Sequence, residues 1–284
     1  MPAFSAVTRR RLTVLALAAG IVALLALAPG AWADAFTPES GGSPNADSID
    51  SLYKIVLYVG ILIFLIVEGA LIWSLVRHRA RRGGPEPAQI RGNTPLELGW
   101  TVGAGMILVV ITVVTFVFLA DIQNPPASDP GGLASGVEVA AIGQASPPGG
   151  GKALEIGVNG QQYLWRYDYP GGEVYGYYEM VVPIKTTVTL KITSSDVIHS
   201  WWIPKLGGKA DATPGHTNQT WFKIDKPGSY EGQCAELCGD NHADMRARVR
   251  AVEPAEYERY IERRKADIKQ AQTDLAIQRR KRGQ

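Results

Sequence analysis

The segment from Cys234 to Met245 holds the residues best suited to chemistry. It contains both cysteines of the chain, Cys234 and Cys238, together with the imidazole of His242 and the thioether of Met245. A second imidazole, His199, lies near the end of an expected strand. Thiolate, thioether and imidazole donors together favour copper, whereas carboxylate-rich sites favour hard ions. These residue types therefore predict a copper site that also recruits His199.

The number of thiols bears on how many copper ions the site holds. A single-copper electron-transfer site uses one cysteine, two histidines and a weak methionine ligand, and this chain has one cysteine more. Our interpretation is that two thiolates bridge two copper ions, each with one terminal histidine, and that Met245 and a backbone carbonyl are weak axial ligands. Sharing one electron between two metals in a rigid scaffold reduces the geometric change on reduction, which favours fast electron transfer.

Three other interpretations of these residues stay open at this point. In an exported chain, cysteines at positions i and i+4 are compatible with a disulfide. Structural zinc in a Cys₂His₂ set is the second alternative, although zinc has little use for Met245. The third is a chance grouping of core residues.

The apolar stretches upstream predict how the chain is anchored. An arginine cluster, an apolar run and the motif Ala31-Trp32-Ala33 predict a signal peptide over residues 1–33, with an uncleaved first membrane helix as the alternative. Within the region 34–121, the apolar stretches 52–76 and 98–120 each reach the roughly 20 residues that cross about 30 Å of hydrocarbon. The arginine-rich loop between them is expected in the cytoplasm, so the chain beyond 121 lies outside.

The rest of the chain divides by composition. Residues 122–152 are rich in proline and glycine and predict a linker. Short runs rich in Val, Tyr, Thr and Ile from 153 to 253 predict a β-sandwich. Residues 254–284 predict a solvated helix with a basic end, and contact of that end with anionic lipid or another subunit is the alternative. The formal charge of +2 does not suggest nucleic-acid binding.

At residues 234–245 the sequence Cys-Ala-Glu-Leu-Cys-Gly-Asp-Asn-His-Ala-Asp-Met resembles the copper A loop of cytochrome c oxidase subunit II. The sequence Asp-Val-Ile-His-Ser-Trp at 196–201 resembles the upstream histidine motif of that family. The resemblance implies a two-helix transmembrane hairpin followed by an all-β cupredoxin-like (Greek-key sandwich) domain outside the plasma membrane of a bacterium. It also implies a dinuclear copper A centre whose ligands are His199, Cys234, Cys238, His242, Met245 and the main-chain carbonyl of Glu236.

The resemblance implies a function and partners as well. The chain is expected to be the electron-entry subunit of an aerobic terminal oxidase, which takes electrons from a cytochrome c-type donor and passes them to the haem of subunit I, where dioxygen is reduced. The carboxylate of Glu236 is expected to bind magnesium shared with subunit I, and subunit III and membrane lipid are expected neighbours. Positions that resemble family residues near the subunit I interface or the donor surface are Asp196, Lys209 and Asp211.

Two acids belong to the membrane region. Glu97, just before the second helix, resembles the acid that opens a proton-uptake path in the family. Glu68 lies well inside the first helix, where an acid must face protein or water rather than lipid. A packing contact with subunit I and a proton role are both open for Glu68.

The chain departs from the family pattern where electrons enter. The family has a tryptophan at the position of Tyr163, so Tyr163 is the candidate entry residue, and Trp165 in the same segment is a second candidate. A usual arginine after Pro-Gly is replaced by His216. The tyrosine at position 163 leaves open which donor docks and by which route its electrons enter.

Several functions compete with the leading one. The copper A subunit of a haem-copper nitric oxide reductase would share the helices and the ligands. A quinol oxidase subunit keeps the fold but typically lacks the copper ligands, which this chain has. A membrane-tethered copper chaperone needs an exposed, exchangeable site. The chain has no haem-attachment motif of the C-x-x-C-H type, so it is not expected to carry its own cytochrome.

Overall fold

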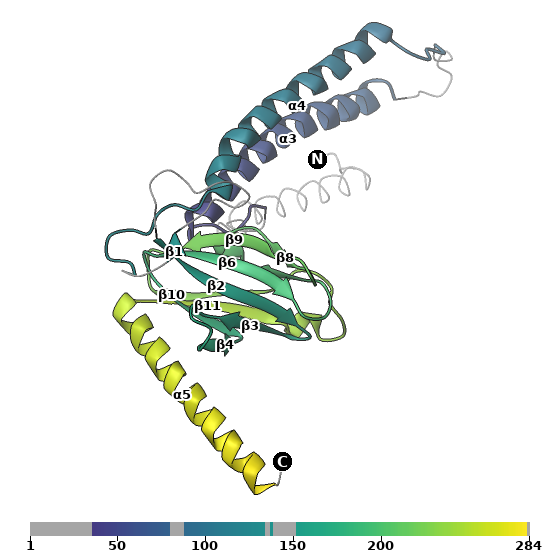
Figure 1. The fold of residues 1–284 in the computed structure, drawn as a ribbon. Helices are drawn as coiled ribbons and strands as arrows, with labels where there is room; N and C mark the ends of the chain where they lie inside the picture. Colours follow the sequence, from purple (N-terminus) through teal and green to yellow (C-terminus); the bar gives the residue numbers. More distant parts are fainter. Residues whose placement is uncertain (1–35, 80–87, 134–136, 139–151, 283–284) are drawn as a thin grey trace, which may run out of the picture. The chain divides into compact units, whose positions relative to one another are not determined.

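A computed structural model describes residues 36–79, 88–133, 137–138 and 152–282 of the chain (Figure 1). The expected signal peptide over 1–33 lies outside the described residues, as does much of the expected linker. What the structure describes is a pair of long apolar helices, a β-sandwich and a C-terminal helix.

The two apolar helices are α3, Pro44–Arg77, and α4, Thr94–Gln123, and both are long and apolar enough to cross a membrane. They extend beyond the apolar stretches 52–76 and 98–120, because hydropathy locates only the lipid-compatible part of a helix and not its polar ends. Helix α4 starts at a capped position: the Asn93 side chain accepts a hydrogen bond from the Leu96 amide at 3.3 Å. The cap satisfies a backbone N–H that would otherwise lack a partner.

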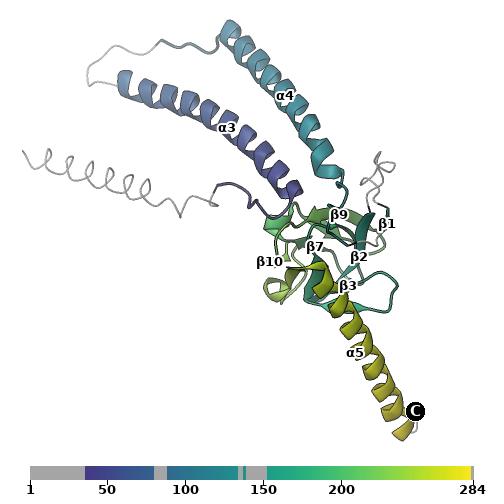
Figure 2. The ribbon, with the colours of Figure 1, turned by 90° about the vertical axis from the view of Figure 1, so that its left-hand side faces the viewer.

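The β-domain has two sheets, as expected for the all-β sandwich (Figures 1 and 2). In β6, Thr187–Ser194, buried side chains alternate with more exposed ones through much of the strand, as they do when one face of a sheet covers a core. The first sheet has the order β4-β3-β2-β6-β9 with β1 paired to β2, and comprises Tyr175–Tyr177, Leu164–Asp168, Lys152–Gln161, Thr187–Ser194, Asn218–Lys223 and Val137–Glu138. The second has the order β5-β11-β10-β7-β8, and comprises Glu179–Pro183, Arg246–Val252, Gly228–Cys234, His199–Trp202 and Ala210–Ala212.

Large side chains from both sheets fill the space between them. Trp165 and Tyr167 of the first sheet are fully buried, as are Met180 and Val249 of the second. Burial raises the pKa of Tyr167 well above its ordinary value, so its hydroxyl stays neutral. This packed interior fixes the two sheets against each other beneath the strand ends where the predicted metal site lies.

Residues 122–133, the start of the expected linker, are bound to the sandwich. After α4, the Trp221 indole of β9 donates a hydrogen bond to the Ile122 carbonyl at 2.9 Å. The Thr187 hydroxyl donates to the Pro126 carbonyl at 2.7 Å, and Lys223 forms an ion pair with Asp129 at 2.9 Å. The sandwich therefore supplies the hydrogen-bond partners and the burial that the composition of residues 122–133 lacks.

The C-terminal helix α5, Pro254–Lys281, attaches to the sandwich through its first turns. Tyr257 is buried, and its ring and that of Tyr260 lie 6.4 Å and 6.1 Å from the Tyr169 ring. Arg264 donates a hydrogen bond to the Tyr175 carbonyl at 3.1 Å. From residue 269 to residue 282 the side chains are exposed, so the anchoring comes from the aromatic contacts at the base.

We predict that Tyr257→Ala lowers the free energy of unfolding by about 3 kcal/mol, because it removes a buried aromatic side chain and leaves a cavity. Leu275→Ala in the exposed part of the same helix is the control and is expected to stay within about 0.5 kcal/mol of the unaltered chain. Chemical unfolding of the full chain in detergent measures both. Equal effects of the two substitutions would contradict an anchor at the base of α5.

Candidate metal centre

Pairing of three strands brings the predicted metal-binding residues together. His199 is the first residue of β7, Cys234 is the last of β10, and Met245 immediately precedes β11. Residues 234–245, which we call the ligand loop, connect β10 to β11 and contain the short 3₁₀ helix His242–Asp244. The loop is closed by a hydrogen bond from the Cys234 amide to the Met245 carbonyl at 2.8 Å.

The two sulfurs lie at the middle of the site. The Sγ atoms of Cys234 and Cys238 are 3.9 Å apart. His199 Nδ1 is 3.9 Å from the Cys234 sulfur, and His242 Nδ1 is 3.6 Å from the Cys238 sulfur. The two imidazoles therefore approach different sulfurs, each with its Nδ1 atom.

Two weaker donors complete the group. The Met245 thioether sulfur lies 3.8 Å from the Cys238 sulfur. The Cys234 thiol donates a hydrogen bond to the main-chain carbonyl of Glu236 at 3.2 Å. The structure thus gathers all five side chains that the sequence singled out, together with the Glu236 carbonyl, around the two sulfurs.

The chemistry of this donor set fits a soft metal cation. The thiols are free, and a sulfur–sulfur distance of 3.9 Å is far from the roughly 2.05 Å of a disulfide. Burial raises the pKa of Cys238 to about 11, and the neighbouring Cys234 adds to the effect. Two thiolates so close together need a cation to balance their charge. Met245 favours copper over zinc in that role.

Asp196 orients the His199 ring. Its Oδ1 atom lies 2.8 Å from His199 Nε2, which leaves Nδ1 directed at the sulfurs. The carboxylate also accepts hydrogen bonds from the amides of Gln162 at 2.7 Å and Val197 at 2.6 Å. Desolvation alone would raise the pKa of Asp196, but these bonds outweigh it and lower the pKa to about 2. The sequence predicts Asp196 near the subunit I interface or the donor surface, and it misses this contact, for which the i, i+3 spacing from His199 is a signal.

The His199 ring also packs against the first sheet. The fully buried Trp165 meets the ring edge-on, with centroids 5.9 Å apart. Gly160 lies so close that a Cβ atom there would stand 2.9 Å from His199 Cδ2 and 3.1 Å from Trp165 Cζ3. Only glycine fits this position without a shift of the ring, a requirement that the sequence alone did not reveal.

Tyr163, the candidate entry residue, lies half-buried beside the ligand loop. Its hydroxyl oxygen accepts a hydrogen bond from the Asp240 amide at 3.1 Å. Trp165, two positions along, is fully buried. Of the two candidate aromatics, Trp165 is therefore the one in contact with a predicted ligand, and Tyr163 is the one near the surface.

The remaining candidates make none of the contacts to the sulfurs described above. The Glu97 carboxylate accepts a hydrogen bond from the Asn93 amide at 3.0 Å and so helps to cap α4. Glu68 is half-buried within α3. The Lys209 ammonium lies 5.9 Å from the centre of the Trp202 ring. The other two, both exposed, are Asp211 and His216.

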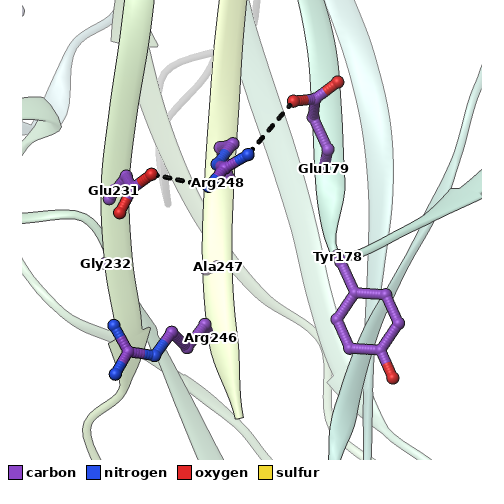
Figure 3. Close-up of a pocket in the computed structure, with 7 residues that line it drawn as sticks. All are labelled: Tyr178, Glu179, Glu231, Gly232, Arg246, Ala247 and Arg248. Carbon is purple, nitrogen blue, oxygen red and sulfur yellow. Dashed lines mark hydrogen bonds and ion pairs between the residues drawn. The ribbon is translucent and has the colours of Figure 1, made fainter. Parts of the chain in front are cut away.

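A groove of about 200 Å³ on the outer face of the second sheet is separate from this site (Figure 3). Arg248 crosses it and pairs with Glu231 at 2.7 Å and with Glu179 at 4.0 Å. Tyr178 and Arg246 line its other end. None of the predicted metal-binding residues lines the groove.

Comparison with known proteins agrees with the geometry. The family model for the transmembrane domain of cytochrome c oxidase subunit II matches residues 31–118, and the model for its periplasmic domain matches residues 172–252. The chain is 32% identical over 236 residues to cytochrome c oxidase subunit 2 of Alkalihalophilus pseudofirmus, with 83% of this chain and 64% of that protein covered.

A second relative is matched over more of its own length. The chain is 31% identical over 254 residues to a probable cytochrome c oxidase subunit 2 of Rickettsia bellii, with 82% of this chain and 84% of that protein covered. The solved periplasmic domain of subunit II of cytochrome oxidase (CoxB) of Bradyrhizobium japonicum is 37% identical, with 40% of this chain and 95% of that domain covered and a TM-score of 0.39.

The two family models and the two sequence relatives assign the chain a role. It is subunit II of an oxidoreductase complex, and it crosses the membrane twice with its C-terminal domain on the outer side. The cluster of His199, Cys234 and Cys238, whose donor atoms lie within 4.8 Å of one another, suits copper binding. The chain belongs to the cytochrome c oxidase subunit II family.

Proposed function

We propose that this chain holds a dinuclear copper A centre, accepts electrons there from a cytochrome c-type donor, and passes them to the haem of subunit I for the reduction of dioxygen. The residues that would hold the copper ions are His199, Cys234, Cys238, His242, Met245 and the carbonyl of Glu236. When bound, the centre supplies one-electron redox chemistry shared between two metals.

One observation carries the proposal: two free thiols lie 3.9 Å apart with a different imidazole Nδ1 atom beside each sulfur. A single-copper site needs one thiolate only, so the second sulfur would have no role in it. Two thiolates with a different imidazole beside each would together hold a two-copper centre.

The surrounding residues support fast electron transfer by keeping the donors in place. The Asp196 carboxylate fixes the tautomer and orientation of His199, and the buried Trp165 packs edge-on against the same ring. His199, Cys234 and Met245 are each at most 1% exposed, so water is kept from them. Donors that cannot rearrange and cannot be hydrated keep the geometric cost of a change in oxidation state small.

Burial also argues against a copper chaperone. An exchangeable site needs an approach for a second protein's ligands, and among the predicted ligands only His242 and the Glu236 segment are partly open to solvent. A quinol oxidase subunit would have no use for the complete donor set. Electron entry from a soluble donor therefore remains the function that uses every one of these residues.

We infer that the donor docks near the ligand loop. The exposed acids Asp240 and Asp244 lie on this loop, and such a surface favours a donor with a basic face. Tyr163 lies nearest to that surface and Trp165 lies behind it against His199, so electrons would enter past Tyr163. The buried Trp165 would then couple Tyr163 electronically to His199 and would not touch the donor itself.

Contacts with the rest of the complex are inferred in the same way. The described residues offer no hydrogen bond or ion pair to the Glu236 carboxylate, so it is available for magnesium shared with subunit I. Glu97 would open a proton path at the cytoplasmic end of α4 while it caps the helix. Subunit III and membrane lipid would surround the exposed apolar faces of α3 and α4.

We predict that the copper-loaded full chain in detergent gives a mixed-valence electron paramagnetic resonance spectrum with hyperfine structure from two equivalent copper nuclei. Cys234→Ser and Cys238→Ser are each expected to abolish that spectrum, because one bridging thiolate is lost. His216→Ala, which alters an exposed imidazole outside the site, should leave it unchanged. A single-copper spectrum from the unaltered chain would refute the dinuclear assignment.

We predict that Gly160→Ala weakens copper retention roughly 10- to 100-fold, the range seen when groups that orient metal ligands are disturbed. The physical reason is the 2.9 Å approach of the added methyl group to the His199 ring. Gly157→Ala in the same strand is the control, because its Cβ would meet Asp168 Cβ at an ordinary 3.4 Å. Copper loss to a competing chelator measures both variants, and equal rates would exclude a ligand-orienting role for Gly160.

We predict that Glu236→Gln leaves the copper spectrum intact, because the main-chain carbonyl is unchanged, but removes the magnesium site in the assembled oxidase. Mn²⁺ substituted for magnesium gives a direct spectroscopic signal. Retention of bound Mn²⁺ in the variant complex would show that the Glu236 carboxylate is not a ligand. The copper spectrum of the same sample serves as the internal control.

A further inference from the structure

The turn between β2 and β3 lies directly on the ligand loop. Its two residues are Gln162 and Tyr163. The Gln162 side-chain amide donates a hydrogen bond to the Cys238 carbonyl at 2.6 Å, and the Asp240 amide donates one to the Tyr163 hydroxyl oxygen at 3.1 Å. Together these bonds hold both peptide groups that flank Gly239.

Gly239 permits this close contact. Its φ of +132° lies in a region that favours glycine, and a Cβ atom there would stand 2.5 Å from the Tyr163 hydroxyl oxygen. The Gly239 carbonyl in turn accepts a hydrogen bond from the His242 amide at 3.1 Å. The contact with Tyr163 thus reaches the backbone turn that connects Cys238 to His242.

The β2–β3 turn has a firm base from which to hold the loop. The Gln162 amide donates to Asp196 Oδ2 at 2.7 Å, and the other oxygen of that carboxylate contacts His199. The Tyr163 ring packs against the hydrophobic core. The β2–β3 turn is thus fixed by contacts outside the ligand loop. A displacement of the Cys238–His242 turn would break its hydrogen bonds to Gln162 and Tyr163.

We propose that Tyr163 is a positioning residue. Its hydroxyl accepts the hydrogen bond from the Asp240 amide and so holds the Cys238–His242 turn in its metal-binding conformation. We call this hydrogen bond the latch. The proposal rests on the proposed function, since holding this turn matters for copper only if Cys238 and His242 bind it. The hydrogen-bond chemistry is specific to tyrosine here, because the Asp240 amide needs an acceptor and an indole N–H is only a donor. A tryptophan at this position cannot make the same bond.

Hydrogen exchange of the metal-free full chain in detergent tests the latch without any copper. Tyr163→Phe removes only the hydroxyl, and Tyr163→Trp substitutes a larger aromatic that has no acceptor. Both are expected to speed exchange in the peptide covering Gly239 to His242 roughly five- to tenfold, the effect of one lost hydrogen bond. Tyr230→Phe is the control: this half-buried hydroxyl has no hydrogen bond to another of the described residues. Exchange in β6 reports whether each variant is folded.

Copper retention provides the second measurement. Both Tyr163 variants should lose copper to a chelator several-fold faster than the unaltered chain, whereas Tyr230→Phe should not. If a folded Tyr163→Phe variant exchanged the Gly239–His242 peptide at the rate of the unaltered chain, the proposed role of the Tyr163 hydroxyl would be wrong. Failure of the unaltered chain to form the two-copper spectrum would instead refute the proposed function, and the exchange result would stand by itself.

Discussion

The metal centre depends on one carboxylate. Asp196 contacts His199 through one oxygen and the Gln162 amide through the other, so a single side chain connects the remote histidine to the turn that holds the ligand loop. Its hydrogen bonds lower its pKa to about 2, so it stays ionised well below neutral pH, and a charged acceptor makes stronger hydrogen bonds than a neutral one. Pairing of β7 with β10 already places His199 near Cys234, and this link adds a connection from the histidine to the β2–β3 turn that contacts the ligand loop.

One sheet of the sandwich carries the predicted ligands and the other carries the residues that restrict them, which explains why a sandwich suits this site. His199 and the ligand loop belong to the second sheet, whose strand β10 pairs with β7 on one side and β11 on the other. The residues that restrict them, Gly160, Trp165 and Tyr163, come from the first sheet or its β2–β3 turn. Packing of the core therefore sets the distance between ligands and supports, and a change deep in the core would be felt at the metal site.

The sequence predicted the architecture and singled out five side chains that the fold gathers around two sulfurs, but it did not indicate the residues that support them. Cysteine, histidine and methionine are chemically distinctive, and long apolar runs identify membrane helices wherever they pack. The close approach of Gly160 to His199 depends instead on tertiary register, as does the bond between Tyr163 and Asp240. The anchoring of residues 122–133 escaped prediction for the same reason: a proline- and glycine-rich segment gains its order from the surface it meets.

The ligand loop must satisfy two opposed requirements. Contact with partner proteins needs an exposed surface, and Leu237 between the two cysteines is 79% exposed. Metal binding needs a fixed backbone, which packing from the solvent side cannot supply. The rigidity must therefore come from beneath, through the bonds from the Cys234 amide to the Met245 carbonyl and from the Ala235 amide to the Ser200 carbonyl, both 2.8 Å. Those bonds hold the ends of the loop, whereas its middle is held from the β2–β3 turn by the Gln162 side chain and the Tyr163 hydroxyl.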